Sequence, residues 1–225
     1  MIRSIIYKEW LKIRYYWLIA LFFNILLFAY LFINIRHLFV LEPAQMVWYN
    51  AIHIGTLFYD DIKYLMPATG ILIGAAQFIP EADKERLRLS LHLPVRLESL
   101  ALFYIFIGIS FVAATAAIDC IFLSIVTGFF YPQEVTVSST LTALPWFFSG
   151  FPAYLGTSLV ILETQWPARL FYLIISAGFA CLFYQSNDYN SYVHIMGRLT
   201  VLSGLFIPAL ILPVYRFRNR SGGWH

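Results

Sequence analysis

The chemically most informative residues of the sequence are polar side chains inside apolar segments. Asp119 lies within the longest apolar run, residues 95–131, and Asn24 is the only strongly polar residue of the apolar segment 18–35. An ionisable group inside a membrane is costly, which makes it a candidate for function. Arg198, in the last apolar segment, is the predicted partner of Asp119, either in a structural ion pair or in a transport path. We therefore predict an intramembrane polar site of Asn24, Asp119 and Arg198, with a carboxyl group near water at the outer edge as the alternative.

Sequence motifs of nucleotide hydrolysis and of proteolysis are absent. The chain has no G-x-x-x-x-G-K-[ST] phosphate loop, so it is not expected to hydrolyse ATP by itself. It also has no H-E-x-x-H motif, and Ser149-Gly150 and His194 occur without a G-x-S-x-G elbow. The histidines and acidic residues show no ligand spacing such as H-x₃-H, so no metal site and no catalytic residue are predicted.

A polar stretch from Glu81 to Glu98, EADKERLRLSLHLPVRLE, separates strongly apolar segments. Its leucines alternate with polar residues, a period of two that is typical of a strand, although the sequence offers no partner strand. Pro94 restricts the residue before it to extended geometry and can start a helix. The leucines are too apolar to face water without a partner, and the charges are too many to enter lipid. The stretch therefore predicts a surface that meets a soluble partner.

The composition predicts the elements that position these residues. Of the 225 residues, 60% are hydrophobic and 12% are charged, whereas a soluble domain carries about 25% charged residues. A membrane span requires ~20 apolar residues, so the chain has room for about six spans in a single domain, 1–225, and none for a separate soluble enzyme domain. We predict an all-α polytopic membrane protein. Its transmembrane helices are predicted at 18–35, 64–80, 98–131, 143–162, 170–185 and 194–215.

The connecting segments are predicted from their polarity. Residues 1–17 are amphipathic at helical spacing, which favours a helix in the membrane interface with its apolar face in lipid and its basic residues at headgroup phosphates. The alternative is that they form only the charged start of the first span. We expect residues 38–59 in the outer interface, residues 81–97 in a cytoplasmic loop and residues 132–142 in an outer loop. Pro67, Gly70 and Gly74 predict a kinked or closely packed second span.

The distribution of basic residues predicts the orientation of the spans. Lysine and arginine resist translocation and remain on the cytoplasmic side. With six spans and both termini inside, twelve of the 15 basic residues fall on the inner side and three on the outer side. The outer three are Arg36, Lys63 and Arg198. We therefore predict that both termini and the loop 81–97 are cytoplasmic.

Two short segments of this arrangement resemble a known family. The amino-terminal Tyr7-Lys8-Glu9-Trp10-Leu11 is similar to the interfacial helix of the permease subunits of ABC type-2 exporters. In that family the second span is followed by a glutamate, a charged turn and a leucine-rich stretch that ends in Leu-Pro-Val or similar. The corresponding residues are Glu81, Glu85-Arg86 and Leu89-Ser90-Leu91-His92-Leu93-Pro94-Val95. The small permeases of haem-export and nitrous-oxide-reductase maturation systems are the nearest in size. The alternating leucines depart from a cleanly helical coupling segment.

The resemblance implies partners that the chain lacks in itself. It implies a separate cytoplasmic ABC ATPase that holds ATP and Mg²⁺, a second permease copy or a homologous permease, and a bacterial plasma (inner) membrane as the lipid bilayer around the spans. It implies that an unidentified substrate is exported. No cofactor on this chain and no nucleic acid partner are expected. The residues implied to couple the ATPase to the spans are Glu81, Glu85, Arg86, Leu89, Leu91, His92 and Pro94. The rival classes are a non-transporting membrane scaffold and an intramembrane enzyme, and an adjacent ATPase gene would favour the permease.

Overall fold

The computed structural model describes residues 2–54, 56–83, 97–186, 189–192 and 194–219. Within these ranges the ordered elements are helices and no strand occurs. Six helical segments are long and apolar enough to cross a membrane: Ile6–Leu41, Asp60–Ala82, Glu98–Phe130, Gln133–Leu162, Trp166–Tyr184 and Met196–Arg216. The prediction of an all-α polytopic membrane protein with six spans is confirmed.

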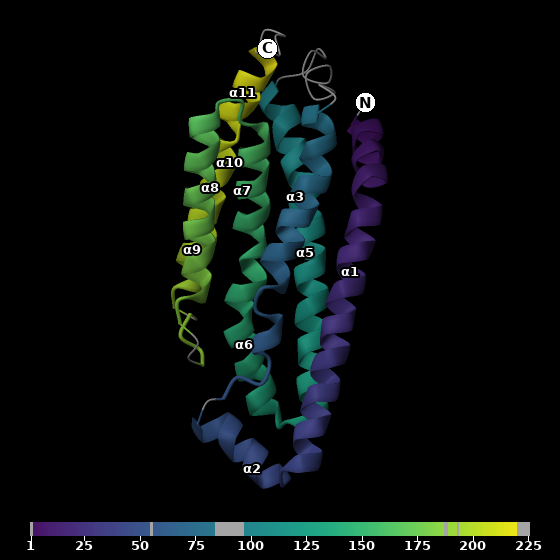
Figure 1. Cartoon of the computed structure of the whole chain (residues 1–225), viewed down its shortest axis with the longest axis vertical. Coiled ribbons are helices and arrows are strands. Elements are labelled where there is room, and N and C mark those ends of the chain that lie inside the picture. Colours follow the sequence, from purple (N-terminus) through teal and green to yellow (C-terminus); the bar gives the residue numbers. More distant parts are fainter. Residues whose placement is uncertain (1, 55, 84–96, 187–188, 193, 220–225) are drawn as a thin grey trace.

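The helices run side by side along one long axis, and both ends of the chain lie at the same end of the bundle (Figure 1). We call this the terminal end, because α1 begins there and α11 ends there. The helices are α1 (Ile2–Leu41), α2 (Ala44–Tyr49), α3 (Leu65–Asp83), α5 (Leu97–Phe130), α6 (Gln133–Phe148), α7 (Gly150–Leu162), α8 (Trp166–Cys181), α9 (Met196–Gly204), α10 (Phe206–Ala209) and α11 (Ile211–Asn219). Short π and 3₁₀ turns lie at Asn50–Ile54, Asp60–Ile62 and Leu182–Tyr184.

Helix α1 corrects the prediction of a separate interfacial helix. It continues without a break for 40 residues, because the sequence from Ile2 to Leu41 contains neither proline nor glycine. Its predicted lipid face packs on α5 instead: the rings of Trp10 and Phe111 stack with centroids 5.5 Å apart, and Trp17 Nε1 donates to Thr115 Oγ1 at 3.0 Å. The start of the chain is therefore one continuous helix with the first candidate span, which begins at Ile6.

Helix α6 corrects a second prediction, because residues 133–142 are helical and do not form a loop. Pro132 stands at the N-cap, where its fixed φ favours the start of a helix. The hydroxyl groups of this polar segment bond to carbonyl oxygens four residues earlier, as in Thr140 to Thr136 at 2.8 Å and Thr142 to Ser138 at 2.7 Å. Hydroxyl groups satisfied in this way allow a polar sequence to remain helical. The fourth span therefore consists of α6 and α7, which meet at Ser149.

The remaining boundaries differ from the predicted ones by a few residues. Helix α8 begins at Trp166, four residues before the predicted start of the fifth span. The sixth span is divided into α9, α10 and α11 near Pro208 and Pro213, whose nitrogen atoms cannot donate a helical hydrogen bond. The segment 38–59 extends α1 to Leu41 and then forms α2, which lies across the end of the bundle opposite the terminal end (Figure 1).

Glycines allow α3 and α7 to approach closely. A Cβ atom added to Gly70 would collide with the Gly150 carbonyl oxygen, and one added to Gly74 would lie 3.2 Å from the Tyr154 carbonyl oxygen. Small residues at such contacts let two backbones approach, which is how many membrane helices associate. This contact confirms the prediction that the second span is closely packed.

We expect Gly70→Ala to lower the stability of the bundle by about 1–3 kcal/mol, because the new methyl group meets backbone atoms that cannot rotate away. Gly178→Ala is the matched control, since nothing lies within 4 Å of the added Cβ atom in α8. The control should be neutral or slightly stabilising, because alanine favours a helix over glycine. The midpoints of thermal unfolding of the two variants in lipid nanodiscs test this. Equal midpoints would contradict the α3–α7 contact.

Candidate functional site

A cluster of charged side chains joins α1 and α3 at the terminal end. Glu9 and Glu81 are 0% and 1% exposed. Lys12 Nζ lies 2.7 Å from Glu9 Oε1 and 2.9 Å from Glu81 Oε1, and Lys8 Nζ lies 2.9 Å from the same Glu81 oxygen. Two lysines and two glutamates make the cluster neutral as a whole. We call Lys8, Glu9, Lys12 and Glu81 the charge cluster.

Gln77 extends the charge cluster to α5 and α7. Its amide nitrogen donates to Glu9 Oε2 at 3.2 Å and to the Tyr104 carbonyl oxygen at 2.8 Å, and its amide oxygen accepts from the Tyr154 hydroxyl at 2.8 Å. Gln77 is 0% exposed and Tyr154 is fully buried with it. A Cβ atom added to Gly108 would collide with the Tyr154 hydroxyl, so the glycine leaves room for this contact. The polar network thus connects α1, α3, α5 and α7.

Helical spacing brings these side chains together. Glu9 and Lys12 are three residues apart, and Lys8 and Lys12 are four apart, so all three lie on one face of α1. Gln77 and Glu81 are four residues apart on one face of α3 and meet that face. A buried ion pair contributes little net stability but is costly to break, because the remaining partner stays buried without compensation. The charge cluster therefore fixes the position of the end of α3 relative to α1.

The predicted coupling residues stand in two groups. Glu81 is placed inside the bundle as the acceptor for Lys8 and Lys12. The others, Glu85, Arg86, Leu89, Leu91, His92 and Pro94, lie outside the described residues. The described helices on either side of them, α3 and α5, end at Asp83 and begin at Leu97, both at the terminal end (Figure 1).

Sequence reasoning missed Lys8, Glu9, Lys12 and Gln77 as members of this site. It assigned the basic residues of the first 17 positions to headgroup phosphates, whereas Lys12 points into the bundle with a side chain that is 16% exposed. The sequence offered two signals. Glu9 stands near two lysines, and Gln77 stands four residues before Glu81. Both place polar groups at helical spacing in apolar surroundings.

The intramembrane polar site differs from its prediction in one partner. Asn24 and Asp119 meet as predicted for one site: Asn24 Nδ2 and Asp119 Oδ2 are 2.8 Å apart, and the two residues are 1% and 0% exposed. The predicted partner Arg198 is exposed on α9, and within the described residues no ion pair joins it to Asp119. Asp119 lies where α5 packs on α1, close to Phe122 of α5, whose ring stacks on Phe28 of α1 with centroids 5.8 Å apart. Its partner therefore comes from α1.

A second charged contact lies at the terminal end. Glu163, at the end of α7, is fully buried and pairs through Oε2 with Arg216 Nη1 of α11 at 3.0 Å. Its other carboxylate oxygen accepts from the backbone N–H groups of Thr164 and Gln165 at 2.9 and 3.1 Å. The contact holds the last helix to α7 at the same end as the charge cluster.

Tyrosines occupy the opposite end of the bundle. Phe58 stacks on Tyr131 with ring centroids 4.3 Å apart, and Tyr59 is 0% exposed. Burial raises the pKa of Tyr59, of Tyr131 and of Tyr189, because the phenolate form loses its hydration. These phenols are structural and neutral. Within the described part of the chain, no three histidine, cysteine, aspartate or glutamate residues gather where they could hold a metal ion.

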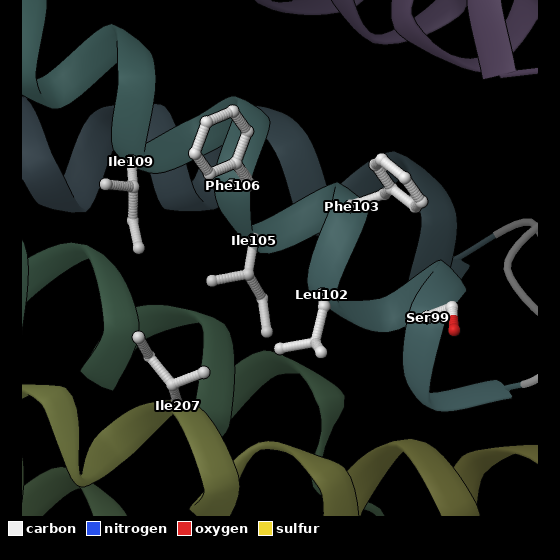
Figure 2. Close-up of a pocket in the computed structure, with 7 residues that line it drawn as sticks. All are labelled: Ser99, Leu102, Phe103, Ile105, Phe106, Ile109 and Ile207. Atoms are coloured by element: carbon white, nitrogen blue, oxygen red, sulfur yellow. The ribbon is translucent and has the colours of Figure 1, made fainter.

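An apolar groove of about 530 Å³ lies between α5 and α10. Leu102, Ile105 and Ile109 of α5 face Ile207 across it (Figure 2). The lining is completed by Ser99, Phe103 and Phe106. Ser99 is the one polar residue among these lining residues and none of them is charged, so the groove offers little to orient a polar ligand.

Comparison with protein-family models, with curated proteins and with solved structures finds no match for this chain.

Proposed function

We propose that this integral membrane protein is the permease subunit of an ATP-driven exporter, with a separate cytoplasmic ATPase that holds ATP and Mg²⁺. The chain contains no phosphate-binding loop, so a partner must supply the energy. The six-span architecture and the resemblance of residues 7–11 and 81–95 to ABC type-2 permeases support this function. One six-span unit supplies half of a pathway, so a second permease copy or a homologous permease completes it.

The charge cluster is the observation that carries this proposal. A permease driven by another protein requires a rigid connection between the docking segment and several spans. Glu81 stands three residues before position 84, where the charged, leucine-rich segment begins, and Lys8 and Lys12 bind it from α1. Gln77 of α3 donates to the Tyr104 carbonyl oxygen and so connects α5 to the same network. A force applied to the segment after α3 would therefore reach α1 and α5 together.

We propose that the terminal end is cytoplasmic, in a bacterial plasma membrane. The basic residues support this orientation, since twelve of 15 belong to the terminal end in the predicted topology. In a chain without Cys120 and Cys181, a cysteine at position 84 should react with an impermeant maleimide only from the cytoplasm. A cysteine at Glu134, which is exposed near the opposite end, should react only from outside. Labelling of position 134 from the cytoplasm would contradict six spans in this orientation.

The direct test of the function is association with an ATPase. The tagged chain is expressed together with the ATPase encoded by a neighbouring gene and purified into lipid nanodiscs. We expect the ATPase to co-purify and to hydrolyse MgATP in the complex. An absence of any associated ATPase would favour a membrane scaffold or a transporter driven in another way.

A further inference from the structure

Asp119 is a buried carboxyl group that the proposed function does not use. It is 0% exposed in the interior of the bundle, and its Oδ1 atom has no hydrogen-bond partner within the described residues. Its Oδ2 atom faces the side-chain amide of Asn24 at 2.8 Å. Beyond that amide lies Thr69 of α3, whose Oγ1 is 3.4 Å from the other amide atom. Three helices therefore meet through Asp119, Asn24 and Thr69.

The Asn24 amide supplies a donor to one carboxyl oxygen of Asp119. Asn24 Nδ2 donates to Asp119 Oδ2, and Asn24 Oδ1 lies 3.4 Å from Thr69 Oγ1, whose hydroxyl has a shorter contact with the Leu65 carbonyl oxygen at 3.0 Å. Within the described residues, no group donates to the other carboxyl oxygen, Oδ1.

An ionised Asp119 would leave a charged oxygen in the interior without a donor. A neutral acid avoids this cost, because it carries its hydrogen on Oδ1 and accepts from Asn24 Nδ2 on Oδ2. We infer that Asp119 is a proton-binding site, held as a neutral acid with the proton on Oδ1 and with Oδ2 accepting from Asn24.

The surrounding charges agree with a neutral Asp119. An ionised carboxylate in an apolar interior is costly unless a cation pairs with it, and such a group becomes neutral instead. On α1, Lys8 and Lys12 pair in the charge cluster, Arg14 lies over Tyr15, and Arg36 is exposed. On α3, Lys63 pairs with Asp60 at the opposite end. The other ionisable groups of the helices packed on α5 are Arg3, Tyr7, Glu9, Tyr15, Tyr16, Tyr30 and His37 of α1, Glu81 and Asp83 of α3, Glu134 of α6, Tyr154 of α7, and Tyr215, Arg216 and Arg218 of α11. Arg216 pairs with Glu163. On α5 itself the other groups are Glu98, Tyr104 and Cys120.

Asn24 joins α1, α3 and α5 through its two amide atoms. Its Nδ2 donates to Asp119 of α5, and its Oδ1 faces the hydroxyl of Thr69 of α3. Loss of the proton would leave Asp119 Oδ1 as a buried carboxylate oxygen without a donor, so water or a donor would have to reach it. Release of the proton therefore requires the helices around Asp119 to rearrange. This site is independent of the proposed ATPase, so either can fail without the other.

Infrared spectroscopy of the whole protein tests the site directly. The chain has five aspartates, Asp60, Asp61, Asp83, Asp119 and Asp188, and ¹³C at their carboxyl carbons separates them from the glutamates. In lipid bilayers at neutral pH, we expect one labelled carboxyl in five to give the carbonyl band of a protonated acid, and this band should shift in D₂O. Labelled wild-type protein with only carboxylate bands would overturn the proposal, and no variant is needed for that result.

Two variants test whether the band belongs to Asp119 and whether Asn24 is its hydrogen-bond partner. Asp119→Asn should remove it, whereas Asp60→Asn, at an exposed position, should leave it unchanged. Asn24→Ala removes the donor to Oδ2, so the band should move to the frequency of a weakly bonded acid and remain present. A band that survives Asp119→Asn, or one that Asn24→Ala does not move, would overturn the assignment. If Asp119→Asn does not fold, the shift caused by Asn24→Ala decides.

Discussion

Replacing Glu81 by glutamine should lower the stability of the bundle by about 3 kcal/mol, because a buried ion pair that loses one partner leaves the other charge uncompensated. Glu81 is the common acceptor of Lys8 and Lys12, so the variant places two lysines against the single carboxylate of Glu9. For a chain of this size, the loss corresponds to a fall of roughly 10 °C in the midpoint of thermal unfolding. The measurement is the unfolding midpoint in lipid nanodiscs.

A matched control and a double variant separate this effect from a general effect of charge. Glu98→Gln removes a carboxylate at the same end, but Glu98 is exposed and, among the described residues, accepts only from Tyr215, so the midpoint of this variant should change little. Lys8→Gln added to Glu81→Gln restores neutrality, and the pair should cost less than the sum of the single changes. Equal midpoints for Glu81→Gln and Glu98→Gln would show that the charge cluster does not hold the helices.

Hydropathy was sufficient to predict the six spans, because a bilayer requires long apolar helices whatever their packing. It could not predict which face of a span meets protein. Trp10 and Trp17 were assigned to lipid and instead contact Phe111 and Thr115. Lipid and the interior of a membrane bundle are equally apolar, so a stripe of apolar residues does not distinguish them.

The polar residues were identified correctly as unusual but were paired by the wrong rule. Opposite charge suggested Arg198 for Asp119, whereas the bundle provides the uncharged amide of Asn24. A span sequence places residues along a helix but does not say which helices are neighbours, and that order decides the partner. Glu81 was identified from its place before the charged segment. Its role in binding Lys8 and Lys12 depends on contact between α1 and α3, which the sequence does not give.

The charge cluster, extended by Gln77, and the Asp119 site place two kinds of polar contact on α1, α3 and α5. The charge cluster is at the terminal end, where Lys8 is 39% exposed and water can exchange with its charges. Asp119 and Asn24 are enclosed, so only a neutral form is inexpensive there. Movement of α1 against α3 and α5 would have to break ion pairs at one level and a hydrogen bond at the other. The two levels together resist small displacements of α1.

Leu89→Asp or Leu91→Asp should abolish association of the proposed ATPase and the transport that depends on it. These leucines alternate with polar residues in a segment that lies outside the described residues, so the argument rests on their sequence. Interface cores bury aliphatic anchors inside a charged rim, and a carboxylate at such an anchor would be buried without a partner. Arg86→Ala should weaken association more modestly and in a salt-dependent manner, because exposed charges are screened.

Ser90→Asp is the matched control, since it adds the same charge between the two leucines at a position that is already polar. We expect it to retain the ATPase. All four variants should reach the membrane in normal amounts, because none alters a span. The measurement is the amount of ATPase that co-purifies with each variant, relative to the amount of permease in the membrane. Leucine variants that insert normally and still retain the ATPase would contradict the coupling role of this segment, and equal loss in Ser90→Asp would assign the effect to charge alone.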